Sequence, residues 1–579
     1  MPTSHRPSIR AKRHVVSSVH YLASMAGMRI LESGGNAADA GVAAGLCINV
    51  LEPEYAHFGG VAPIIYCPGS GGPVETISGL GRWPKAANLD FFKQHYDGDL
   101  PAGLWRTVTP AAPDAWLTAL ARFGTMTFEE VVQPALDLTE NGRPVDARFQ
   151  AAMAGPGSQS YPSTEAVFRP HGQVPQVGQI FLQPDLAETF KRLIKAERRA
   201  SGDREAGLKA ARDLIYRGEI AREIAAYHQR AGGLLTYRDL ADFSVRVERP
   251  EQIDYKDHQV YSCGPWCQGP ALLMVLKLLQ GFDLPGMGYG TADYLHTLIE
   301  AIKLAFADRH AYFGDPDFVQ VPMAGLLSDQ YATERRRALD PARAAPDMPP
   351  PGDPWPYHPQ ARLENGSTPH PPVKAALPEP IAHWESDTSY LCVVDQAGNT
   401  FSATPSDGIG SSPVIPGLGF PISARGTQTW LEAGHPSVLQ PWKRPRLTPN
   451  PALVLKHGRP FMPIGCPGGD AQVQGMLQVF LNIVEFGMEP QEAIEAPRAI
   501  SHSFPNSFWP HGSRPGQVVV ETRIPAPVRD ALRERGHIVQ EDGAWSSGAS
   551  RVCAITVDPE TGVRTGGADP RSTSYAIGW

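Results

Sequence analysis

Residues 383–400 contain the hairpin around which the rest of the chain is organised, and they read His383-Trp-Glu-Ser-Asp-Thr-Ser-Tyr-Leu-Cys-Val-Val-Asp-Gln-Ala-Gly-Asn-Thr400. Residues 390–394 form a short apolar run that is typical of a β-strand, and the turn at 395–398 predicts a hairpin into a second strand from Asn399. Thr388 stands just before the first strand, between an aspartate and a serine. We therefore expect Thr388 to lie at the mouth of a β-hairpin.

The segment upstream of this hairpin is rich in proline. Residues 341–380 contain 13 prolines in 40, a density that excludes helix and central strand, so we expect a mobile run-in to Thr388. A chain that cut itself there would expose an N-terminal threonine, which holds a hydroxyl nucleophile and an amine base (pKa about 7.7–8.0) in one residue. By itself, Asp-Thr-Ser before a strand favours the structural interpretation, because it is ordinary loop chemistry.

Composition narrows the class of protein. The 579 residues have a net charge of −8, so no overall positive field exists to hold nucleic acid or an anionic membrane. No uninterrupted apolar segment is long enough to span a bilayer, and we expect a soluble, cytoplasmic protein. Seven cysteines, among them Cys263 and Cys267 in a CxxxC spacing without a matching second pair, indicate neither a disulfide framework nor a zinc site.

Helical patterns dominate the first half of the chain. Asn36 begins a helix that runs to about Val50, and its alanines and glycines allow close packing against a sheet. Strands over 62–66 and 74–77 predict a hairpin, and residues 127–130 form a capping box that begins another helix. Residues 292–312 have apolar side chains at helical spacing, as expected for a buried helix.

The second half has more strands. We expect an edge strand over 417–422, a hairpin formed by 451–455 and 460–464, and a helix over 471–486. Helices and strands mix without βαβ alternation or a detectable repeat. The sequence therefore predicts an α+β layered sandwich.

Three strings indicate a family. They are Asn-Ala-Ala-Asp at 36–39, Pro-Gly-Gly-Asp at 467–470 and Ala-Asp-Pro-Arg at 568–571. With Thr388, the chain resembles over nearly its whole length the γ-glutamyltransferase family of N-terminal-nucleophile (Ntn) hydrolases, and more closely its hydrolase-type members. The resemblance implies a four-layer αββα sandwich built from two self-cleaved segments. These are a large chain, 1–387, with the proline-rich tail 341–387, and a small chain, 388–579, intertwined in one domain.

The resemblance also implies catalytic residues. Thr388 is the expected nucleophile, and Ser406 the second hydroxyl that hydrogen-bonds it and assists self-cleavage. Gly468 and Gly469 are expected to form the oxyanion hole, because a strand that enters Pro-Gly-Gly-Asp at a helix start directs backbone N–H groups at one point. Asp470 is the expected N-cap of that helix. A turn serine and simple Gly-Gly turn chemistry are the structural alternatives.

The substrate pocket departs from the family pattern. Leu80 stands where relatives have the arginine that binds the γ-glutamyl carboxylate, and Arg82 follows two residues later. The segment 423–428 lacks the acid expected to bind the ammonium, and Thr448 belongs to the pair that replaces the family's Ser-Ser. Arg82 and Arg425 are the candidates to bind an anion, although each could instead form a salt bridge.

These expectations combine into a function. The sequence predicts a self-processing amidohydrolase that acts, without metal or organic cofactor, on a small amide with an anionic acyl part, with water or an amino acid or peptide as acceptor. The alternatives are a γ-glutamyltransferase or glutathione hydrolase acting on γ-glutamyl amides, and an uncleaved, non-catalytic binding protein of the same fold. A metal-dependent amidohydrolase is disfavoured, because the 18 histidines form no HExxH or HxH motif.

Overall fold

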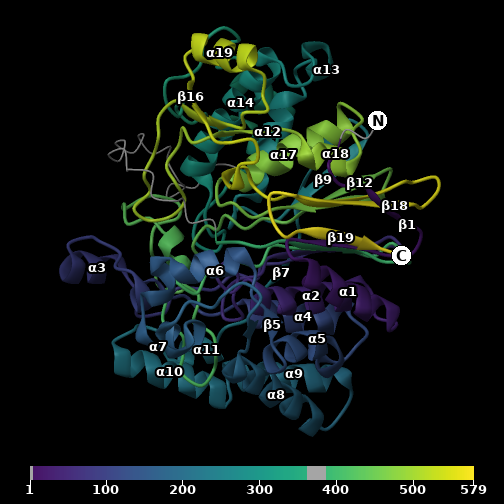
Figure 1. Ribbon diagram of the computed structural model, residues 1–579. Coiled ribbons are helices and arrows are strands. Elements are labelled where there is room, and N and C mark those ends of the chain that lie inside the picture. The colour runs from purple at the N-terminus through teal and green to yellow at the C-terminus, as the bar shows by residue number, and fades with distance from the viewer. Residues whose placement is uncertain (1–3, 361–386) are drawn as a thin grey trace.

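The fold is built on two seven-stranded sheets that pack face to face (Figure 1). A computed structural model of the chain describes residues 4–360 and 387–579. Every neighbouring pair of strands in the two large sheets is antiparallel. The first sheet has the order β19 (Tyr575–Gly578), β2 (Val15–Ser18), β10 (Leu391–Val394), β11 (Thr400–Ala403), β3 (Ile64–Cys67), β4 (Glu75–Ile77) and β7 (Val247–Glu248). The second has the order β1 (Ile9–Ala11), β18 (Arg564–Ala568), β17 (Cys553–Val557), β13 (Arg459–Gly465), β12 (Ala452–Lys456), β9 (His258–Ser262) and β8 (Glu251–Tyr255).

Helices cover the outer face of each sheet, which gives four layers (Figure 1). On the first sheet lie α1 (Tyr21–Glu32) and α2 (Ala37–Leu51), followed outward by α4 (Ala112–Phe123), α5 (Phe128–Glu140), α8 (Pro184–Arg199), α9 (Arg204–Tyr216) and α10 (Glu219–Ala231). On the second lie α12 (Gly269–Leu279), α17 (Ala471–Val484) and α18 (Pro490–Glu495), with α14 (Ala292–Tyr312) packed on α12. The predicted αββα sandwich is confirmed.

Smaller elements surround this sandwich. A three-stranded sheet of β14 (Ala499–Ser501), β15 (Gln517–Val520) and β16 (Ile538–Glu541) packs with α19 (Ala526–Glu534) near α14. A two-stranded sheet pairs β5 (Arg143–Pro144) with β6 (Ile180–Phe181). The shorter helices are α3 (Leu89–Tyr96), α6 (Ala147–Ala154), α7 (Pro162–Phe168), α11 (Tyr237–Ala241), α13 (Leu284–Met287), α15 (Met323–Leu326) and α16 (Asp329–Arg336). Within the described ranges, no helix is long and apolar enough to cross a bilayer.

The helix α2 shows why small residues are needed at the centre of the fold. Asn36 caps it through a capping box with Asp39, and all fifteen of its residues are buried. A Cβ atom at Gly41 would lie 2.3 Å from the ring of Phe401 on β11. Glycine therefore lets α2 lie directly on the central hairpin, as the sequence indicated.

Each large sheet combines strands from both sides of residue 387. In the first sheet, β10 and β11 lie between β2 and β3, and in the second, the block from β18 to β12 lies between β1 and β9. The division into a large and a small chain stays a prediction, but any cut before Thr388 would leave these pairings in place.

The structure contradicts one expected strand and limits the expectation of a mobile proline-rich segment. The edge strand expected over 417–422 is wrong: only an isolated bridge from Val414 to Pro421 forms, because Gly417 and Gly419 have left-handed φ angles of 80° and 76°. The part of the proline-rich segment before residue 361 is fixed against α14, since Lys303 donates to the carbonyl of Ala345. Residues 361–386 of the expected mobile run-in lie outside the described residues.

Candidate active site

Thr388 and Ser406 face each other across the start of the central hairpin. The Ser389 N–H donates to the Pro405 carbonyl (2.8 Å) and the Asp407 N–H to the Asp387 carbonyl (3.4 Å), so Thr388 and Ser406 form a non-hydrogen-bonded antiparallel pair. Such pairs bring side chains close together. The two hydroxyl oxygens lie 2.7 Å apart, and both residues are fully buried. The structure thus brings together the two predicted hydroxyl residues.

Arg425 completes this group from the opposite side. Its Nη2 donates to the backbone carbonyl of Asp387 (2.8 Å), and it also hydrogen-bonds the hydroxyl of Ser406. Ser406 in turn donates to the same carbonyl. With the Asp407 N–H, the carbonyl that precedes Thr388 therefore receives three hydrogen bonds, an arrangement that suits nucleophilic attack on its carbon.

Two carboxyl groups, those of the partly buried Asp387 and the buried Asp407, accompany Arg425. The Asp387 carboxylate lies 2.9 Å from Arg425 Nη2, and the Asp407 carboxylate lies 3.8 Å from Arg425 Nε. Burial raises the pKa of the Asp407 carboxyl to about 7, against the opposing effect of Arg425. Asp407 also accepts a hydrogen bond from the hydroxyl of Ser423. Burial likewise raises the pKa of Asp387, again opposed by Arg425.

Gly468 and Gly469 form a tight turn between β13 and α17. Their φ angles are 129° and 56°, which strongly favour glycine. No acceptor is recorded among the described residues for the N–H group of either glycine, so both can serve a ligand. In the first turn of α17, Gln472 Nε2 lies 3.5 Å from Thr388 Oγ1. The turn therefore lies beside the hydroxyl pair, as an oxyanion hole requires.

Asp470 occupies the predicted N-cap position of α17 and supports this turn through its carboxylate. No side-chain cap bond forms at this position. Its carboxylate instead pairs with Arg309 of α14 and accepts from Ser507 N–H (2.8 Å) and Oγ (2.6 Å). Although burial alone would raise the pKa of Asp470, Arg309 and Arg446 hold it below its ordinary value. Asp470 thus anchors the glycine turn to α14.

Thr448 and Arg82 lie in different environments. Thr448 is fully buried, and its hydroxyl accepts from Gln428 Nε2 (2.9 Å), at the end of the short helix that begins at Arg425. Arg82 donates to the carboxylates of Asp317 (2.8 Å) and Asp315 (3.5 Å). In the described ranges, no hydrogen bond or ion pair joins Arg82 to Thr388, Ser406 or Arg425. Substrate binding by Arg82 stays a prediction. In the structure, Asp315 and Asp317 already form ion pairs with its guanidinium group.

The sequence did not identify Asp407, Gln472 or Arg551 as members of this site. Arg551 is 3% exposed, and its Nη2 donates to the backbone carbonyl of Thr388 (3.1 Å). It comes from a loop before β17, next to Ser550, whose φ is 70°. No local motif marks these three positions, since Gln472 and Arg551 contact Thr388, and Asp407 approaches Arg425, only in the tertiary fold.

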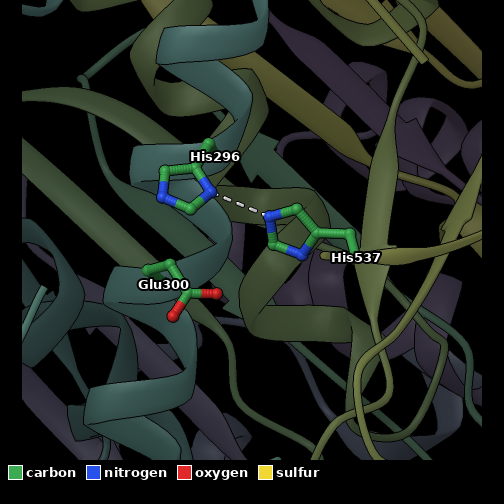
Figure 2. A group of neighbouring side chains, drawn as sticks. All are labelled: His296, Glu300 and His537. Atoms are coloured by element: carbon green, nitrogen blue, oxygen red, sulfur yellow. Dashed lines mark hydrogen bonds between the residues drawn. The ribbon is translucent and has the colours of Figure 1, made fainter. Parts of the chain in front are cut away.

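A second group of ionisable side chains lies between α14 and the loop after α19 (Figure 2). His296 Nδ1 and His537 Nε2 are 2.9 Å apart, and ligand atoms of His296, Glu300 and His537 lie within 4.8 Å of one another, a donor set that suits zinc. However, the ammonium of Lys303 lies 2.7 Å from the Glu300 carboxylate. The charge of Glu300 is thus already balanced, and we assign this group a structural role.

The fold and the site define a class. Two antiparallel sheets between helical layers, with a buried threonine at the start of a central strand, are the architecture of an Ntn hydrolase. The chain matches the gamma-glutamyltranspeptidase family profile over residues 23–579, and it belongs to this family of enzymes.

Three relatives illustrate the range of the family. The chain is 29% identical to the glutathione hydrolase-like YwrD proenzyme of Bacillus subtilis, over 99% of each chain. A solved structure of LmbA2991T421A is 37% identical over 100% of both chains, with a TM-score of 0.90. The crystal structure of cephalosporin acylase from Bacillus halodurans is 30% identical, covering 100% of this chain and 98% of that one, with a TM-score of 0.84. Relatives thus include a protein named as a proenzyme and one named as an acylase.

Proposed function

We propose that this chain is a self-processing amidohydrolase that cleaves amides with an anionic acyl part through an acyl-enzyme on Thr388. The observation that carries this proposal is the position of Asp387. Arg425 binds both its backbone carbonyl and its side-chain carboxylate. Asp387 is the acyl half of the bond before Thr388, so the chain itself presents a carboxylate-bearing acyl group to the nucleophile.

Maturation follows from this arrangement. The Thr388 hydroxyl oxygen attacks the Asp387 carbonyl carbon, whose oxygen is hydrogen-bonded by Arg425 and Ser406. The hydroxyl proton passes through Ser406 to the departing backbone nitrogen as the C–N bond breaks, which leaves an ester. Water opens the ester, giving a carboxylate at Asp387 and a free hydroxyl and α-amine at Thr388.

The mature enzyme repeats this chemistry on a substrate. The α-amine of Thr388 takes the hydroxyl proton, the oxygen attacks the substrate carbonyl, and the leaving amine takes up the proton. The N–H groups of Gly468 and Gly469 stabilise the negative charge that develops on the carbonyl oxygen. Water then releases the acid from the threonyl ester, with the same amine as base.

Arg425 gives the substrate preference. Once Asp387 has left, Arg425 keeps Asp407 at 3.8 Å but loses the carboxylate at 2.9 Å. A buried cation without its partner is costly, and the carboxylate of an incoming acyl group would restore the pair. The substrates of the proposed enzyme are therefore a small amide and water. The two segments of one precursor stay together in the same sandwich, and the proposed location is the cytoplasm.

The first prediction concerns the site of the cut. We expect a small chain of residues 388–579, which is 192/579 of the 62.7 kDa total, or about 21 kDa. Mass spectrometry of its N-terminus should give Thr-Ser-Tyr-Leu. A different first residue, or an active preparation with one uncut chain, would contradict the proposal. An uncut chain that binds an amide but does not turn it over would favour a non-catalytic binding protein.

The second prediction concerns the acyl group. We expect kcat/KM for a glutaryl anilide to exceed that for the matching γ-glutamyl anilide, because the glutaryl group offers a carboxylate to Arg425 and no ammonium to bury. The two compounds differ only in the α-amine, so each is the control for the other. A tenfold preference for the γ-glutamyl compound, about 1.4 kcal/mol, would contradict it.

That contrary result would favour the second candidate function, hydrolysis or transfer of γ-glutamyl groups. Asp407 favours this second function. Its buried carboxylate lies near Arg425, although segment 423–428 itself contains no acid to bind an ammonium. If Asp407 binds the substrate ammonium, Asp407→Asn should lower kcat/KM for the γ-glutamyl anilide while sparing the glutaryl compound.

A further inference from the structure

The backbone geometry of Thr388 fixes where its α-amine will lie. In a non-hydrogen-bonded antiparallel pair, the N–H and C=O groups of each residue point away from the partner strand. Thr388 and Ser406 form such a pair. The nitrogen of Thr388 therefore lies on the same edge as its carbonyl, which Arg551 binds at 3.1 Å.

Arg551 belongs to a buried group with excess positive charge. The guanidinium groups of Arg148 and Arg551 lie over the ring of Tyr55, 5.0 and 4.7 Å from its centroid. Nη1 of each arginine has no hydrogen-bond partner among the described residues. The carboxylate of Glu52, which accepts from the Ser389 hydroxyl, is the acid that offsets them. Two arginines thus face one carboxylate beside Thr388.

We propose that Arg551 is a positioning residue whose charge keeps the α-amine of the mature Thr388 unprotonated, and hence able to act as general base, near neutral pH. This inference rests on the proposed function. A fixed positive charge disfavours a second one nearby, so it lowers the pKa of an amine. The hydrogen bond from Arg551 to the Thr388 carbonyl also holds the residue in the orientation that directs its hydroxyl at Ser406.

Other ionisable groups surround the same position. Asp387 leaves with the cut, and burial lowers the pKa of His57 to about 3, with Arg425 adding to the effect, so this imidazole is neutral. Burial, reinforced by Glu52, raises the pKa of Glu54 to about 8. Arg551 contacts the Thr388 carbonyl and shares the Tyr55 ring with Arg148, with Glu52 and Glu54 close to both arginines. On the Ser406 side lies Arg425, with Asp407 and His57 close to it. The net charge of these groups is positive, because three arginines outnumber the carboxylates of Glu52 and the partly ionised Asp407.

The α-amine pKa can be measured without turnover. In the purified two-chain enzyme, the rate of acetylation of the Thr388 amine by acetic anhydride is followed against pH by mass spectrometry of the N-terminal peptide. We expect a wild-type pKa below the ordinary value of about 7.7–8.0. Arg551→Met should raise it by about one unit, Arg551→Lys should restore it, and the acidic limb of kcat/KM should move to higher pH in parallel.

Arg564→Met is the matched control. Arg564 is also buried and also donates to a backbone carbonyl of this hairpin, but to Asp395 at its other end (2.8 Å). It should leave the α-amine pKa unchanged. If Arg551→Met does not mature, Arg148→Met removes one of the same charges and keeps the Thr388 contact, and it should raise the pKa by a smaller amount.

These measurements distinguish the role of Arg551 from the proposed function. An α-amine pKa that is the same in wild type, Arg551→Met and Arg148→Met overturns the role of Arg551, even if the enzyme is cleaved and active. A wild-type chain without an N-terminal Thr388 overturns the proposed function itself.

Discussion

Thr388→Ala is expected to leave an uncut 62.7 kDa chain that hydrolyses no amide. One hydroxyl supplies the nucleophile for both reactions, and its removal should slow each by at least about a thousandfold. Thr388→Ser should keep part of both activities, since serine offers the same oxygen with a less restricted χ1. A denaturing gel and an anilide assay measure the two effects.

Ser389→Ala is the matched control for this experiment. It removes the neighbouring buried hydroxyl, which bonds Glu52 rather than Ser406. We expect this variant to mature and to turn over. If Thr388→Ala were cleaved as fast as wild type, Thr388 would have no part in the mechanism.

Arg425→Met should cause the second large effect. It removes the donor shared by the Asp387 carbonyl and the Ser406 hydroxyl, and loss of such a donor typically costs a hundredfold or more, about 3 kcal/mol. Uncut precursor should therefore accumulate, with its half-life read from gels over time. Arg425→Lys should fall between, because lysine keeps the charge but not the planar pair of donors.

Loss of a buried cation also destabilises a fold, and Arg444→Met controls for that. Arg444 is equally buried and pairs with Asp315 at 2.8 Å, away from the hydroxyl pair. Both variants should lose stability, but only Arg425→Met should delay the cut. Maturation of Arg425→Met at the wild-type rate would contradict the role of Arg425 in polarising the bond.

Local chemistry explains what could be predicted from the sequence. The hairpin of β10 and β11, the cap of α2 at Asn36 and the hairpin of β12 and β13 each follow from signals within a few neighbouring residues. The resemblance added the αββα architecture, and it correctly singled out Thr388 and Ser406 as partners. Neither step could give the order of strands, which depends on pairings between residues hundreds of positions apart.

The same distance in sequence hid part of the site. Arg551 lies 163 residues after Thr388 and Arg309 lies 161 before Asp470, yet each pair is in direct contact. Likewise, Arg82 looked available for an anion because its partners, Asp315 and Asp317, are more than 230 residues away. Charges on a sequence acquire their partners only in the tertiary fold.

The contacts around Thr388 also determine when the bond can break. Ser406 comes close to Thr388 through the local hairpin of β10 and β11, whereas Arg425, which binds the Asp387 carbonyl, lies 38 residues after Asp387 in a separate short helix. For the proposed cut, the chain must therefore fold at least as far as Arg425 before the bond is polarised, because this donor to its carbonyl comes from outside the hairpin. The proposed cut would in this sense report correct folding: molecules that misassemble would keep the bond intact and lack the amine that the proposed turnover needs.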